Sequence, residues 1–144
     1  MTTTFTASII GALAMDLNAT VPHRTNPAIE NLPATADYPA LMEILDYIDT
    51  HLGECELGEQ SIRHRFKLSR ATLYRRFQTL GGVANYIRER RLQLAYRHLT
   101  HNPACSLTWL LYEIGFASER QFQRSFMARF GMSAANWRRN CQAC

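Results

Sequence analysis

The sequence lacks any long hydrophobic segment, and this absence excludes the integral membrane proteins. No stretch approaches the roughly 18 consecutive apolar residues that cross a bilayer. The short apolar run over residues 9–15 has no positive charge ahead of it, so it is a poor secretory signal. We therefore expect a cytoplasmic protein that makes no contact with membranes.

Acidic residues are scarce in the second part of the chain, and almost all of its basic residues are arginine. Residues 1–59 hold nine acidic residues and one basic residue, a balance of −8, whereas residues 60–144 hold three acidic and fifteen basic residues, a balance of +12. Arginine, with fourteen of those fifteen positions, pairs in bidentate fashion with phosphate and with the guanine edge. Such a field attracts polyanions, so nucleic acid is the leading candidate partner and a merely solubilising surface is the alternative.

No arrangement of side chains typical of catalysis or metal binding is present. A nucleophile, a base and an orienting group do not occur together at a recognisable spacing, and the five histidines are scattered, so we predict neither enzymatic activity nor a cofactor. The four cysteines are expected to be free thiols in a chain without an export signal. Cys141 and Cys144 form a C-x-x-C pair, but zinc needs two further ligands, so we predict no metal site.

Proline, glycine and helical periodicity divide the chain into a tail and one helical domain. Residues 1–37 show no sustained period and are predicted to be an irregular tail or linker, with at most a short helix near residues 9–17. From residue 38 to 144 the apolar residues recur at helical spacing, which predicts an all-α domain of about seven helices. Two helix-turn-helix units, at about 57–81 and 106–131, are joined by a long linker helix at about 83–100.

The two helix-turn-helix units align with each other at an offset of 49 residues. Ser69 and Ser118 each open a second helix as its N-terminal cap. At this offset Leu73 matches Phe122, Phe77 matches Phe126, Arg75 matches Arg124 and, in the first helices, Ile62 matches Leu111. An internal duplication is a more specific signal than either short pattern alone.

The second helix of such a unit enters the major groove and presents the face opposite its buried stripe to the bases. On helices 69–80 and 118–130 this face predicts eight DNA-binding residues: Arg70, Ala71, Tyr74, Arg75, Glu119, Arg120, Gln121 and Arg124. The arginines suit guanine and the glutamine suits adenine, while Glu119 is expected to favour its helix N-terminus more than to accept from cytosine.

About the last hundred residues resemble the DNA-binding domain of the AraC/XylS family of bacterial transcription regulators. The resemblance rests on Leu68-Ser69, Leu73, Phe77, Gly82, Tyr86-Ile87, Arg91-Leu92, Ala95, Leu99, Gly115-Phe116, Phe122, Phe126, Phe130-Gly131, Ser133 and Trp137-Arg138. It implies seven helices, two recognition helices about 34 Å apart that enter successive major grooves, and double-stranded DNA and RNA polymerase as partners. Residues 71, 74, 75, 119, 120, 121 and 124 match the positions that the family uses on bases.

The chain departs from the family pattern at four positions. Arg63 and Leu111 replace a small alanine in the first helix of each unit, Lys67 replaces a frequent glycine, and Ala134 replaces a frequent proline. We therefore expect the first unit to bind DNA more loosely than the second. Thirty-seven irregular residues are too short for a sensor domain, so no effector site is visible, and a fragment or truncated form is slightly favoured over a stand-alone regulator.

Two other functions remain open from the sequence. The basic part could belong to a general polyanion-binding module for RNA or an acidic protein, although the exposed aromatic platforms that stack unpaired bases are not evident. Alternatively, the cysteines could form a redox- or metal-responsive switch. A steep salt dependence with a clear sequence preference would favour the regulator over both.

Overall fold

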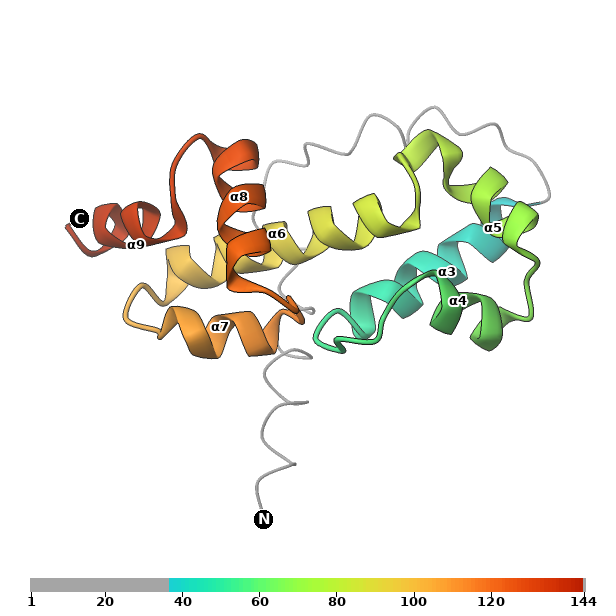
Figure 1. The fold of residues 1–144 in the computed structure, drawn as a ribbon, viewed down its shortest axis with the longest axis horizontal. Helices are drawn as coiled ribbons and strands as arrows, with labels where there is room; N and C mark the ends of the chain where they lie inside the picture. The colour runs from blue at the N-terminus through green and yellow to red at the C-terminus, as the bar shows by residue number, and fades with distance from the viewer. Residues whose placement is uncertain (1–36, 144) are drawn as a thin grey trace, which may run out of the picture. The chain divides into compact units, whose positions relative to one another are not determined.

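The computed structural model describes residues 37–143 and confirms the all-α fold class. These residues form seven α-helices and one 3-10 turn, and none of them lies in a strand (Figure 1). They divide into two compact units, one made of residues 37–51 and 56–87 and the other of residues 52–55 and 88–143. The short helix expected near residues 9–17 lies outside the described residues.

The helices follow one another in the order that the apolar periodicity predicts. They are α3 (Tyr38–Thr50), α4 (Glu59–Phe66), α5 (Arg70–Phe77), the 3-10 turn η2 (Gln78–Leu80), α6 (Val83–His101), α7 (Leu107–Glu113), α8 (Glu119–Phe130) and α9 (Ala134–Gln142). The long α6 begins in the first unit and continues into the second. Within residues 37–143 no helix is both long and apolar enough to cross a membrane.

The first unit packs α3, α4 and α5 through residues that the helical period places on one face of each helix. Its largest fully buried side chains are Ile44, Ile48, Ile62, Leu73 and Phe77. Burying an aliphatic or aromatic side chain of this size contributes about 1.5–3 kcal/mol, so this small set fixes the angle at which α5 leaves α4.

The second unit is held together largely by aromatic rings. Three phenylalanines one helical turn apart on α8, Phe122, Phe126 and Phe130, form a continuous row of tilted rings, with ring centroids 5.5 Å and 4.6 Å apart. Tyr96 of α6 stacks on Phe130 at 4.8 Å, and Trp137 of α9 lies 4.5 Å from the same tyrosine. These ring contacts hold α8 against α6 and α9 within the unit.

Arg91 of α6 binds the backbone of the segment that follows α3, next to the turn between α7 and α8. Its Nε donates to the backbone oxygen of Leu52 at 2.9 Å and its Nη2 to that of Glu54 at 2.7 Å. Gly115 lies in this turn with a φ of +73° and packs against Leu52 and Arg91. A Cβ added there would lie 2.5 Å from the backbone oxygen of Leu52. Burial lowers the pKa of Arg91 and outweighs the charge of Cys55, which raises it. Only glycine fits the turn at this point.

The helix expected over residues 69–80 is shorter than predicted. The α-helix ends at Phe77, and residues 78–80 continue as the 3-10 turn η2 before Gly81, with φ +78°, closes the segment. Leu80 is nevertheless buried. The tighter final turn satisfies backbone groups at the helix end and leaves the outward face of α5 unchanged.

Candidate nucleic-acid interface

The first helix-turn-helix consists of α4, a three-residue turn and α5. Lys67 takes the left-handed conformation, with φ +52°, and the amide of Leu68 then donates to the oxygen of Arg63 at 3.0 Å. The Ser69 hydroxyl accepts from the Thr72 amide at 3.1 Å and caps α5. The predicted cap is therefore present, and the lysine takes a conformation that glycine adopts at lower cost.

The second helix-turn-helix, α7 and α8, repeats this geometry with one residue more between its left-handed residue and its serine cap. Gly115 is left-handed, and the amide of Phe116 donates to the oxygen of Leu111 at 3.2 Å. This bond is the counterpart of the one between Leu68 and Arg63, so the first helices match at an offset of 48. The recognition helices keep the offset of 49 between their serine caps.

The match predicted between Ile62 and Leu111 is therefore wrong by one residue. Ile62 corresponds to Leu110, and both side chains are fully buried. Arg63 then corresponds to Leu111, the pair of bulky residues that stand where the family has a small one. The extra residue, Ala117, lies in the turn and shifts the register of everything before Ser118.

On α5 all four predicted DNA-binding residues lie on the exposed face. Arg70, Ala71, Tyr74 and Arg75 are exposed, and Tyr74 retains 66% of its accessible surface. The neighbouring Arg76 is different: its side chain is only 14% exposed and pairs with Asp37 at 2.7 Å. The structure thus separates two adjacent arginines into one that faces solvent and one that ties α5 to the start of α3.

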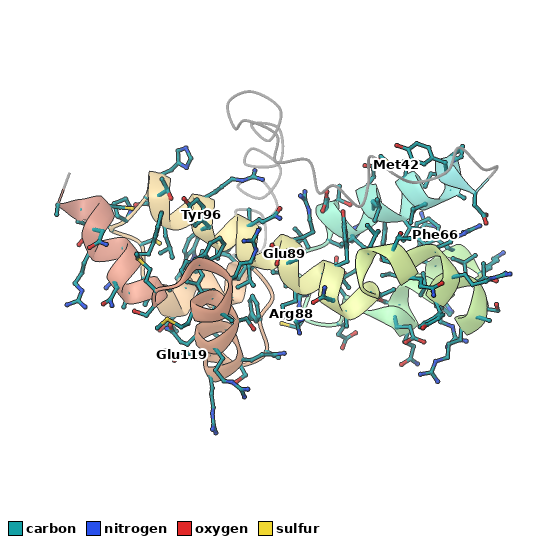
Figure 2. All side chains as sticks on the ribbon, turned by 90° about the horizontal axis from the view of Figure 1, so that it is seen from above. Met42, Phe66, Arg88, Glu89, Tyr96 and Glu119 are labelled. Atoms are coloured by element: carbon teal, nitrogen blue, oxygen red, sulfur yellow. The ribbon has the colours of Figure 1, made fainter. Side chains whose placement is uncertain are left out.

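On α8 the four predicted residues Glu119, Arg120, Gln121 and Arg124 are exposed as well. Figure 2 shows Glu119 at the beginning of α8. A carboxylate in the first turn interacts favourably with the helix dipole, in keeping with the role expected for Glu119. Ser118 caps this helix through a 3.5 Å contact from the Gln121 amide to its hydroxyl, longer than the cap of α5.

Sequence analysis missed Glu59, which binds one of the predicted DNA-contacting arginines. Its Oε1 lies 3.2 Å from Nε of Arg70 and 3.8 Å from Nη1 of Arg63. The pair with Arg63 has the i, i+4 spacing and was visible in the sequence. The pair with Arg70 joins two helices across a turn, and no local spacing indicates it.

No side chains in the described part of the chain gather into a metal site. Residues 37–143 contain no group of three or more histidine, cysteine or acidic residues close enough to hold an ion. Cys55, Cys105 and Cys141 are free thiols, while Cys144 lies outside the described residues. Burial raises the pKa of the Cys105 thiol, which keeps it protonated and weakens it as a nucleophile.

Comparison with known proteins assigns a family to more than half of the chain. A family model described as a helix-turn-helix domain matches residues 63–140, more than half of the chain. The match includes α5, α6, α7 and α8 in full, and therefore all eight predicted DNA-binding residues. No solved structure matches the chain.

Proposed function

Because this chain belongs to the AraC family of helix-turn-helix proteins, we propose that it recognises a specific duplex sequence with two helices, α5 and α8. Its general role, a DNA-binding transcription regulator, follows from the family. In our proposal the helices enter successive major grooves, so the binding site has two half-sites about one duplex turn, roughly 34 Å, apart. Contact with RNA polymerase stays a prediction from the family resemblance.

The matched pair Arg75 and Arg124 carries the proposal. Each arginine lies six residues after a serine cap and two residues before a buried phenylalanine, Phe77 on α5 or Phe126 on α8. Each is exposed. A guanidinium at this point of a recognition helix forms two parallel hydrogen bonds with guanine, worth about 1–3 kcal/mol of discrimination.

The remaining residues of the two faces divide between positioning on phosphate and contact with bases. Arg120 and Gln121 lie in the first turn of α8, where a recognition helix approaches the bases most closely. Free backbone N–H groups at the start of α5 and α8 favour phosphate oxygens there. Phosphate contacts set the orientation of the protein and base contacts set the sequence.

Selection from a random duplex library, followed by variants, tests the proposal. We expect two conserved half-sites, and insertion of five base pairs between them should abolish the preference because it turns one half-site to the opposite face. Arg124→Ala should relax the base preference in one half-site and Arg75→Ala in the other. Arg65→Ala, an exposed arginine of α4 outside the predicted faces, is the matched control.

The outcomes separate the regulator from a general polyanion binder. If the control and both recognition-helix variants lower affinity equally for every duplex, the arginines act only through charge and sequence recognition is refuted. Equal affinity for single-stranded RNA and for the selected duplex would refute it as well.

A further inference from the structure

We propose that Glu59 is a specificity-determining residue of the first helix-turn-helix, because it holds the DNA-facing Arg70 by its Nε atom. This inference rests on the proposed function of α5. Glu59 lies in the first turn of α4 and Arg70 in the first turn of α5, so the ion pair joins the N-terminal ends of both helices of the unit.

The geometry of the pair leaves the DNA-binding edge of Arg70 available. A guanidinium carries five N–H donors, and the carboxylate approaches the one on Nε at 3.2 Å. The two terminal amino groups form the other edge, which pairs with guanine or with two phosphate oxygens. The Arg70 side chain is 79% exposed, so this edge faces solvent while the guanidinium is held from the side.

Glu59 supplies the negative charge of a small depression at the start of α4 and α5. The pair borders an open depression of about 570 Å³ lined by Glu59, Gln60, Arg63, His64, Leu68 and Arg70. Glu59 is the single carboxylate among these six residues and also receives Arg63, whose Nε donates to the oxygen of Leu68 at 3.5 Å. Removal of the Glu59 carboxylate would leave Arg63 and Arg70 without this ion-pair partner.

The ion pair has opposite consequences for specific and for random DNA. With its Nε paired to Glu59, Arg70 presents its outer edge toward the base edges that α5 approaches. On a random duplex the most favourable partner is the nearest phosphate, and Glu59 competes with that phosphate for the guanidinium. The carboxylate therefore weakens sequence-independent binding more than it weakens binding to the preferred site.

The variant Glu59→Gln tests this inference in the full chain. We expect the ratio of dissociation constants for a scrambled and for the selected duplex to fall by about two- to fivefold, the range of an exposed ion pair. The scrambled duplex should bind more tightly, with a salt dependence steeper by about one phosphate contact. Fluorescence anisotropy at two salt concentrations measures both quantities, and circular dichroism checks that the helices are intact.

Two further variants show whether the effect passes through Arg70. Glu56→Gln removes the same charge from an exposed residue of the loop before α4 and should leave the ratio nearly unchanged. In an Arg70→Ala background, Glu59→Gln should no longer lower the ratio. An unchanged ratio in the single variant, or the same fall without Arg70, overturns the inference while the proposed function stands. Failure of the unaltered chain to prefer any duplex overturns both.

Discussion

Replacing Glu113 by glutamine should stabilise the protein at neutral pH. This residue ends α7 and is only 8% exposed, and its Oε2 has no hydrogen-bond partner within the described residues. Burial raises the pKa of the Glu113 carboxyl. The folded chain thus carries a carboxylate that is removed from water at neutral pH and receives no compensating bond at one oxygen.

The size of the gain follows from the difference between burying a charged and a neutral group at this position, because glutamine keeps a polar atom there but carries no charge. Leaving a buried polar group unsatisfied costs about 1–3 kcal/mol, and more when the group is charged. Because glutamine cannot ionise, we expect the free energy of unfolding at pH 7 to increase by about 1–2 kcal/mol. For a domain of this size, that corresponds to a rise in melting temperature of roughly 4–10 °C.

The pH dependence distinguishes this cause from improved packing. A raised folded pKa means that the folded chain binds the proton more tightly than the unfolded chain, so the wild type loses stability as pH rises from about 4.3 through the folded pKa. The advantage of Glu113→Gln should therefore be full at pH 7 and close to zero at pH 4. Urea denaturation followed by circular dichroism measures both, with the exposed Glu43→Gln of α3 as control. An equal gain at both pH values, or none at pH 7, refutes the reasoning.

Three further predictions concern two turn residues and a buried histidine. Gly115→Ala should destabilise the protein by more than about 2 kcal/mol, since its Cβ would meet the oxygen of Leu52 in a left-handed turn. Lys67→Gly should stabilise the protein by about 0.5–1 kcal/mol, because glycine adopts the left-handed conformation of this position at lower cost. The same denaturation assay measures both. Burial, followed by the charge of His101, lowers the pKa of His98, so the stability of the wild type should fall as pH drops below about 6.5. His98→Leu should not show this contribution to the loss. The measurement is the difference in unfolding free energy between the two proteins at pH 7 and at pH 5. A stable Gly115→Ala protein, or an unchanged difference between pH 7 and pH 5, would contradict them.

The sequence predicted those parts of the fold that depend on residues close together in the chain. Ser69, Ser118 and Ser133 cap helices where the apolar stripe begins, and each cap bond spans three residues. The buried and exposed faces of α5 and α8 follow from the helical period, which is why all eight candidate residues were placed on exposed surface. That these side chains contact DNA stays a prediction.

The features that escaped prediction depend on residues far apart in the chain or on one turn residue. Arg91 reaches backbone oxygens 39 and 37 positions away, and Arg76 reaches Asp37 across 39 positions. Such partners follow from tertiary packing, and arginine is common enough in this chain that its pairs cannot be guessed. The extra residue Ala117 escaped because a one-residue shift in a turn leaves the apolar pattern of both helices intact.

The two helix-turn-helix units differ in how firmly each recognition helix is held, and this difference should appear in DNA recognition. α8 carries three phenylalanines in ring contact with one another, and Gly115 in the turn before it packs against the backbone of Leu52 and the side chain of Arg91. α5 is a shorter helix that follows a strained lysine, and its leading arginine is held by an exposed ion pair. A base contact discriminates well only when its side chain is held close to the productive geometry.

We therefore expect the half-site recognised by α8 to be the more strictly conserved one, and Arg124→Ala to lower discrimination more than Arg75→Ala. Lys67→Gly should leave this order unchanged, because relief of backbone strain does not add a support for the side chains of α5. If base substitutions cost the same in both half-sites, packing behind the recognition helix does not govern discrimination in this protein. A more strictly conserved α5 half-site would assign the greater role to the Glu59–Arg70 pair instead.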